Sequence, residues 1–138
     1  MSFRPVYLDS SAIVKLVAAE RESGALLEAL EEWPDRLSSA LADVEVHRAL
    51  WRARAPRAVR DRANAVLSRI VLVRIDEPVL SRASSFKEPS LRALDAIHLA
   101  TALSIADHPD AFITYDARLA AAASKQRLTV AHPGAARL

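Results

Sequence analysis

Four acidic residues stand beside apolar segments in widely separated parts of this sequence. They are Asp9, after the apolar segment 5–8; Glu45, within 40–46; Asp95, at the start of 95–103; and Asp116, after 111–115. A carboxylate in an apolar environment either has a raised pKa and takes up a proton, or needs a cation beside it. If the fold gathers the four side chains, their oxygen atoms predict a hard divalent metal ion as the partner.

Each of these acids also has an ordinary structural interpretation. Asp9 can cap a helix or form a turn, although the two serines that follow it are available for the same capping. Asp95 and Asp116 can cap helices of their own, because the helix dipole favours negative charge near the first turn. Glu45 can face solvent. For each residue alone, the pattern leaves the structural and the metal-binding roles open.

Other side chains with catalytic potential lack the pattern that their chemistry needs. His98 has apolar neighbours and no second histidine at metal-binding spacing, so we expect a hydrogen-bonded core histidine. A Ser11–His98–Asp triad is not expected, because the chain has no Gly-x-Ser-x-Gly turn. The chain also has no cysteine, which excludes disulfides, thiolate zinc sites, iron–sulfur clusters and a cysteine nucleophile.

Composition predicts one globular domain over residues 1–138, since 51% hydrophobic and 26% charged residues suffice for a core. The N-terminal residues lack the pattern of a signal peptide, and no apolar run approaches the roughly 20 residues of a membrane span. We therefore expect a cytoplasmic protein that does not contact a membrane. Gly24 and Gly134 are the only glycines, and neither forms a phosphate-binding turn, so nucleotide cofactors are not expected.

Basic residues are concentrated in one segment, although the formal net charge of the chain is only +2. They are His47, Arg48, Arg52, Arg54, Arg57, Arg60 and Arg62, with Asp61 as the one acid among them. Such a density is able to follow a nucleic-acid backbone. It is equally typical of a solvated helix face in an arginine-rich chain.

The elements that must position the four acids alternate between strands and helices. Strands are expected at 5–9, 37–39, 70–75, 111–115 and 128–130; helices are expected after an N-cap at Ser10, at 22–32, after Ser39, from Pro56, from Pro78, at 92–106 and at 117–125. Short, continuously apolar strands between helices predict an α/β fold with a parallel sheet covered on both faces. Ligands of such sheets bind beyond the carboxyl ends of the strands, where Asp9 and Asp116 are expected.

Four segments of the chain resemble, in order, the motifs of a PIN domain. They are 6–12 (VYLDSSA), 39–45 (SALADVE), 94–102 (LDAIHLATA) and 113–116 (ITYD). The resemblance covers essentially the whole chain and is greatest to the VapC toxins of bacterial toxin–antitoxin pairs. It implies a PIN-like three-layer sandwich, in which a central parallel sheet of about five strands has helices on both faces.

The resemblance also implies an activity and roles for the acids. It implies a metal-dependent endoribonuclease that hydrolyses RNA phosphodiester bonds with Mg²⁺ or Mn²⁺. Asp9 and Asp95 would be the principal metal ligands, and Asp116 a direct or water-mediated ligand. Glu45 would orient or deprotonate the attacking water.

Further residues and partners follow from the same resemblance. Ser11 and Thr114 match positions that often support the acids, whereas Arg127 stands where relatives commonly have glycine. A cognate antitoxin protein is implied, together with assembly as a homodimer or a toxin–antitoxin hetero-oligomer. The apolar residues of the first two helices are candidates for seating a partner helix or for forming the core; they are Ile13, Leu16, Val17, Leu26, Leu27 and Leu30.

Two other functions compete with this interpretation. Aspartyl-phosphate chemistry also places an aspartate at a strand end, but Asp9 is not followed two residues later by the second aspartate of the phosphatases. The acid pair and late lysine of receiver domains are absent as well. A non-catalytic PIN-like module that binds RNA or protein is the alternative, although such a scaffold has no need for all four acids.

Overall fold

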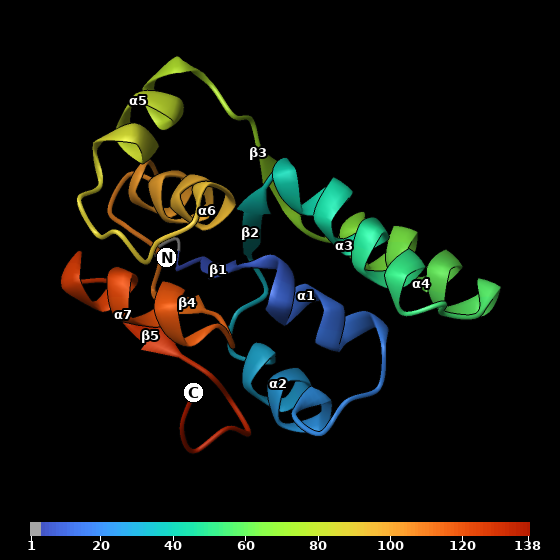
Figure 1. The fold of residues 1–138 in the computed structure, drawn as a ribbon. Helices are drawn as coiled ribbons and strands as arrows, with labels where there is room; N and C mark the ends of the chain where they lie inside the picture. The colour runs from blue at the N-terminus through green and yellow to red at the C-terminus, as the bar shows by residue number, and fades with distance from the viewer. Residues whose placement is uncertain (1–3) are drawn as a thin grey trace.

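The protein is built on a parallel sheet of five strands in the order β3-β2-β1-β4-β5 (Figure 1). The structure, a computed structural model, describes residues 4–138. The strands are β1 (Val6–Leu8), β2 (Arg36–Ser39), β3 (Val71–Val73), β4 (Ala111–Ile113) and β5 (Val130–Ala131); the helices are α1 (Ser10–Val17), α2 (Ser23–Leu30), α3 (Leu41–Arg52), α4 (Arg57–Leu67), α5 (Glu77–Ser85), α6 (Ala93–Leu103) and α7 (Ala117–Lys125). The predicted α/β class and parallel sheet are therefore confirmed.

Alternating side chains of the central strands divide the core into two layers. Val6 and Leu8 of β1 pack among residues of α1, α2, α3 and α4, whereas Tyr7 packs among residues of α6 and α7. Phe112 of β4 joins Tyr7 on that second face, with the two rings stacked 5.2 Å apart. Helix α5 lies outside α6 (Figure 1). Successive residues of a strand point to opposite faces, which explains why these strands are apolar throughout.

Element boundaries differ from the predictions mainly at the ends. Helix α6 ends at Leu103 rather than at 106; Ser104 is its C-cap residue, and the Ser104 hydroxyl donates to the Thr101 carbonyl at 2.6 Å. Asp107 and His108, in the loop that follows, have positive φ angles of 64° and 51°. Strand β3 spans three residues instead of the predicted 70–75. The first three residues of the predicted domain, which belong to the segment compared with a signal peptide, lie outside the described residues. No helix within residues 4–138 is long and apolar enough to cross a membrane.

Parallel strands bring their carboxyl ends to one edge of the sheet. Asp9 follows β1, and Asp116 follows β4, the strand hydrogen-bonded to β1. Asp95 lies in the first turn of α6, and Glu45 lies in the middle of α3. Because α3 and α6 cover opposite faces, their acids approach the edge of the sheet from both sides.

Candidate active site

Asp9 is the most buried of the four acids and is held by three hydrogen bonds. Its side chain is 3% exposed. The carboxylate accepts hydrogen bonds from the Ala12 N–H (3.0 Å), the Ser11 hydroxyl (2.7 Å) and the Thr114 hydroxyl (2.5 Å). Burial raises the pKa of Asp9, and these hydrogen bonds to its charged form oppose that rise. Ser11 and Thr114 thus hydrogen-bond to Asp9, as the resemblance implies for residues that support the acids.

The prediction that Ser10 caps the first helix is wrong, because Asp9 is the N-cap residue of α1. Its backbone is extended, and one carboxylate oxygen accepts the N–H three residues later, as in an ordinary cap. The second oxygen accepts only the Thr114 hydroxyl among residues 4–138. Capping and a role in the acidic site are therefore compatible for Asp9, since they use different oxygen atoms.

Thr114 joins Asp9 to Asp116. Its hydroxyl is fully buried; it donates to Asp9 and accepts the backbone N–H of Asp116 at 3.1 Å. Asp116 is itself the N-cap of α7, with Oδ1 accepting the Leu119 N–H at 2.9 Å. The Ser11 hydroxyl also accepts the Tyr115 N–H at 3.0 Å, so the two loops beyond β1 and β4 are held together.

Asp95 is the least neutralised of the four acids. It is partly buried, and none of the described side chains donates a hydrogen bond to it. Burial, followed by the negative charges of Asp116 and Asp9, raises the pKa of Asp95 to about 6. The Glu45 charge acts in the same direction. The structure therefore brings all four predicted acids within reach of one another's charge. The capping role that the sequence left open for Asp95 does not apply, since the N-cap residue of α6 is Arg92.

Glu45 reaches the site from α3 with one oxygen saturated. Its Oε1 accepts the Ser10 hydroxyl at 2.5 Å and lies 2.6 Å from Nε2 of His98. Burial acts to raise the pKa of Glu45, but the hydrogen bonds with His98 and Ser10 outweigh it and hold the pKa below its usual value. Glu45 thus remains a carboxylate in a site where Asp95 is easily protonated.

The four carboxylates act on one another's charge, but their side chains as placed do not enclose a metal ion. Within residues 4–138, no three His, Asp or Glu side chains are close enough as placed to enclose a metal ion. Like charges repel in the absence of a cation, and this repulsion adds to burial in raising the pKa of Asp95. An all-oxygen set of this kind suits Mg²⁺ or Mn²⁺.

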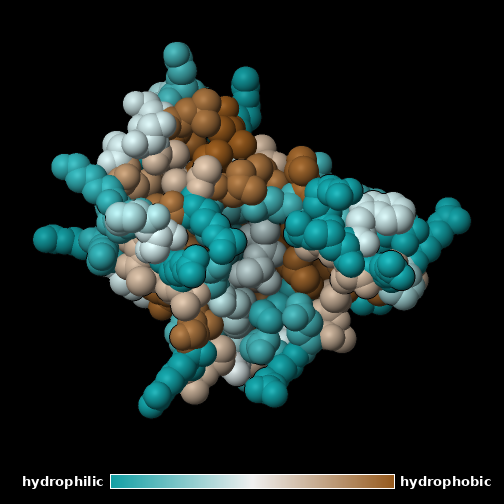
Figure 2. Space-filling view, in the orientation of Figure 1, coloured by the Kyte–Doolittle hydropathy of each residue, from teal (hydrophilic) through white to brown (hydrophobic). Residues whose placement is uncertain are grey.

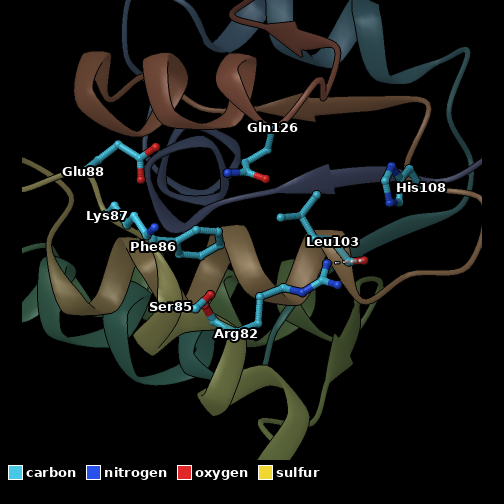
Figure 3. Close-up of a pocket in the computed structure, with 8 residues that line it drawn as sticks. All are labelled: Arg82, Ser85, Phe86, Lys87, Glu88, Leu103, His108 and Gln126. Atoms are coloured by element: carbon cyan, nitrogen blue, oxygen red, sulfur yellow. Dashed lines mark hydrogen bonds between the residues drawn. The ribbon is translucent and has the colours of Figure 1, made fainter.

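An open cavity of about 230 Å³ lies beside the acids. Asp95 and Asp116 line it together with Arg92 and Arg118. A larger cavity of about 510 Å³ lies between Arg82, His108 and Gln126, near the C-terminal end of α6 (Figure 3). That cavity is at the opposite end of the sheet and contains none of the four acids, so the smaller cavity is the one that belongs to this site.

The basic segment forms the paired helices α3 and α4, whose outer end carries mostly hydrophilic side chains (Figure 2). Arg60 lies over the Trp51 ring at 4.3 Å, Arg62 donates to the Val17 carbonyl at 3.0 Å, and Arg57 pairs with Asp61 at 3.9 Å. Part of this segment therefore serves the fold. Contact with RNA stays one of the two interpretations that the sequence left open for this segment.

Sequence reasoning placed His98 in the core and missed its contact with the acids. His98 is 1% exposed and hydrogen-bonded, as expected, but its partners are Glu45 and Tyr7. The available signal was its spacing, because residues three apart on a helix share a face, which puts His98 beside Asp95.

Comparisons with known proteins agree with this architecture. The model of the PIN domain matches residues 6–125. Ribonuclease VapC35 of Mycobacterium tuberculosis is 41% identical over 136 residues, which cover 96% of this chain and 99% of that protein. Ribonuclease VapC46 of the same organism is 42% identical over 128 residues, or 93% and 97% of the two chains.

A solved structure shares the fold at lower sequence identity. It is a toxin–antitoxin complex from Klebsiella pneumoniae, matched with a TM-score of 0.64 and 24% identity over 82% of this chain and 88% of that one. The family match, the full-length relatives and the edge of the sheet that carries the acids all agree. The chain therefore belongs to the PIN-domain family and, within it, to the VapC-type proteins.

Proposed function

We propose that this protein is a metal-dependent endoribonuclease and the toxin of a toxin–antitoxin pair. The observation that carries the proposal is the gathering of four acids at one sheet edge, where burial and the charges of the other acids raise the pKa of Asp95 to about 6. The names of the full-length relatives, each a ribonuclease, support RNA as the substrate.

The residues present fit a divalent ion. Asp9 and Asp95 would be its principal ligands and Asp116 a direct or water-mediated ligand. The three carboxylates lie near enough to act on one another's charge, and carboxylate oxygens are the ligands that such an ion prefers. When bound, Mg²⁺ or Mn²⁺ lowers the pKa of water and polarises a phosphate. Glu45 has a lowered pKa and therefore stays ionised, which suits the task of orienting or deprotonating the attacking water.

Two arginines around the same cavity are suited to the substrate. Arg92 precedes α6, and Arg118 lies in the first turn of α7. A guanidinium beside the carboxylates offers hydrogen bonds to phosphate oxygens that would otherwise be repelled by the acids. We expect Arg118→Ala to raise KM for RNA more than it lowers kcat.

The proposal is tested by RNA cleavage with purified protein in Mg²⁺ or Mn²⁺ and with a chelator. Asp9→Asn and Glu45→Gln should each lower cleavage at least about 100-fold, whereas Asp43→Asn is the matched control. Asp43 lies two residues before Glu45 on α3 but is exposed and lies near His47, at 3.7 Å. Thermal melting checks that the variants are folded.

The second candidate, a non-catalytic PIN-like module, predicts a different result. Such a protein would bind RNA without cutting it, and Asp9→Asn would leave binding unchanged. Absence of cleavage with either ion, together with retained RNA binding, would favour this candidate over the ribonuclease.

A cognate antitoxin in the cytoplasm is part of the same proposal, because an enzyme that cuts cellular RNA must be restrained. The Klebsiella complex with the same fold supports it. Of the apolar residues named as candidates for seating a partner or for forming the core, Ile13, Val17, Leu26 and Leu30 are buried in the protein's own core. Leu16 and Leu27 differ, since they line a cavity of about 280 Å³.

The partner is tested by expressing the chain with and without its neighbouring reading frame. Toxicity should appear only without that partner, and the two proteins should elute as one complex. A partner that places Arg or Lys among the acids by charge compensation should inhibit less in excess Mn²⁺. Equal growth of both cultures and separate elution would contradict the toxin–antitoxin role. The homodimer stays a prediction that sedimentation can check.

A further inference from the structure

A continuous line of hydrogen bonds runs from the interior of the protein to Glu45. The Tyr7 hydroxyl lies 2.8 Å from Nδ1 of His98, and Nε2 of His98 lies 2.6 Å from Oε1 of Glu45. The Ser10 hydroxyl donates to the same oxygen at 2.5 Å. The line joins β1, α6, α1 and α3, so it connects both helical layers through the sheet.

The inner part of this line is rigid and shielded from water. Tyr7 is fully buried and His98 is 1% exposed. The Tyr7 ring stacks on Phe112 and meets the His98 ring edge-on, with centroids 5.9 Å apart. A buried phenol and imidazole are costly unless they are hydrogen-bonded, and here each satisfies the other.

The direction of the outer hydrogen bond follows from the carboxylate. An ionised carboxylate accepts hydrogen bonds and donates none. The hydrogen atom of the 2.6 Å contact therefore lies on Nε2 of His98, which donates it to Glu45. An imidazole with its hydrogen on Nε2 presents Nδ1 as an acceptor to the Tyr7 hydroxyl, 2.8 Å away.

Only one of the two Glu45 oxygens is used in this way. Both contacts, from Ser10 and from His98, fall on Oε1. Within residues 4–138 no donor reaches Oε2, and the Glu45 side chain retains 22% exposure. A long flexible side chain is thereby held by one oxygen, while the other remains available at the acidic edge.

We propose that His98, oriented by Tyr7, is a positioning residue that fixes the Glu45 carboxylate so that Oε2 meets the attacking water. The inference rests on the proposed ribonuclease function and names what holds its water-orienting group. A carboxylate fixed in one rotamer loses less conformational freedom during reaction, and a small misplacement costs rate. Loss of the positioning residue should therefore lower kcat and leave KM nearly unchanged.

Three variants test the line in steps. His98→Ala should lower kcat about 10–100-fold with KM within about twofold, as is typical for groups that orient active-site carboxylates. His98→Gln supplies a side-chain N–H near the position of Nε2 and should restore much of that loss. Tyr7→Phe keeps the stack on Phe112, removes only the hydroxyl, and should lower kcat about threefold to tenfold.

A double-mutant cycle separates positioning from general damage to the core. In a Glu45→Gln background, His98→Ala should change the residual kcat by less than about twofold, because its partner is already altered. Leu99→Val is the control, since Leu99 is a fully buried neighbour on α6 that makes no hydrogen bond to Glu45. Its effect should be equal in both backgrounds. An undiminished His98→Ala effect in the Glu45→Gln background would overturn the proposal.

A spectroscopic measurement distinguishes this inference from the proposed function. Nitrogen NMR of the wild-type protein should show His98 with its proton on Nε2 and a hydrogen-bond acceptor at Nδ1, and the Nε2–H resonance should shift in Glu45→Gln. A proton on Nδ1 would overturn the inference whatever the activity. An inactive wild-type protein with the expected His98 spectrum would contradict the ribonuclease and leave the hydrogen-bonded line established.

Discussion

Acids at the two ends of the sheet have opposite surroundings. At the amino end, Asp110 immediately precedes β4 and accepts hydrogen bonds from Arg4 (2.7 Å) and Trp33 (2.8 Å), which hold its pKa below the usual value. At the carboxyl end, Asp95 lies among Asp116, Asp9 and Glu45, and its pKa is raised to about 6.

The difference shows how residues of one type come to serve structure or chemistry. Asp110 has a cation and an indole N–H, so its charge is compensated within the chain. Asp95 accepts no such hydrogen bond from the described residues, and burial and the negative charges of Asp116 and Asp9 raise its pKa in spite of His98. An uncompensated cluster is unfavourable for folding alone, which is why it indicates a ligand that the chain does not supply.

The largest expected difference between the two ends is in RNA cleavage after Asp95 or Asp110 is replaced by asparagine. Asp95→Asn should lower RNA cleavage at least about 100-fold, because it removes an acid from the proposed site. Asp110→Asn should leave cleavage within about twofold, because it weakens an ion pair with Arg4 and a hydrogen bond from Trp33 at the end of the sheet opposite the proposed site. Initial cleavage rates of both variants decide the point, and a larger loss for Asp110→Asn would reverse the comparison.

Divalent ions should stabilise only the carboxyl end. Binding to the folded state at 100 times Kd adds about 2.7 kcal/mol of stability, so Mn²⁺ should raise the melting temperature of the wild type near neutral pH. The rise should vanish in Asp95→Asn and persist in Asp110→Asn. Calorimetric titration with Mn²⁺ provides the same test directly, and equal binding by wild type and Asp95→Asn would remove Asp95 from the site.

Stability should depend on pH with opposite signs at the two ends. The folded pKa of Asp95, about 6, exceeds its ordinary 3.8, so the folded state binds the proton more tightly. Without metal, protonation of Asp95 should therefore stabilise the protein as pH falls from 7 towards 4, by on the order of 1–2 kcal/mol. Asp110 has a lowered pKa, so its contribution is present above 3.8 and is lost as pH falls below that value.

The pH prediction is checked by urea unfolding in chelator at pH 7, 5.5 and 4.5. The informative quantity is the difference in the free energy of unfolding between wild type and Asp95→Asn, because groups away from the site titrate equally in both. As pH falls, the free energy of unfolding of the wild type should rise relative to that of Asp95→Asn, and saturating Mn²⁺ should abolish this change. A difference that is flat with pH would contradict the raised pKa of Asp95.

The smallest expected effect lies at Arg127, also at the amino end of the sheet. Its φ is +65°, a conformation that costs most residues energy but suits glycine. The glycine that the resemblance implied at this position thus has a physical basis. Arg127→Gly should add about 0.5–1 kcal/mol of stability without changing cleavage. Gln126→Gly is the control, since Gln126 has a φ of −85° and gains no relief.

The order of strands and helices was predictable because local patterns specify it. Continuous apolar runs indicated buried strands, and prolines at 56 and 78 marked helix starts. The helix ends were less predictable, since α6 ends at Leu103 although Ile105 and Ala106 continue the apolar pattern beyond it.

The acids themselves were evident from the sequence, since charged residues interrupting apolar segments are costly without a purpose. Their surroundings were not evident. Asp9 both caps α1 and joins the site, whereas the sequence suggested that Ser10 would do the capping. The second Asp9 oxygen accepts a hydrogen bond from the hydroxyl of Thr114, 105 residues away, which the sequence did not indicate.

The sequence by itself thus determined the parallel α/β architecture, the four acids and the edge of the sheet at which two of them lie. Tertiary structure alone decided that Asp110 receives a cation while Asp95 does not, and that His98 connects Tyr7 with Glu45. The physical reason is the separation along the chain over which each interaction acts. Periodicity and capping act over a few residues, whereas these hydrogen bonds join residues 53 to 106 positions apart and form only when both helical layers close on the sheet.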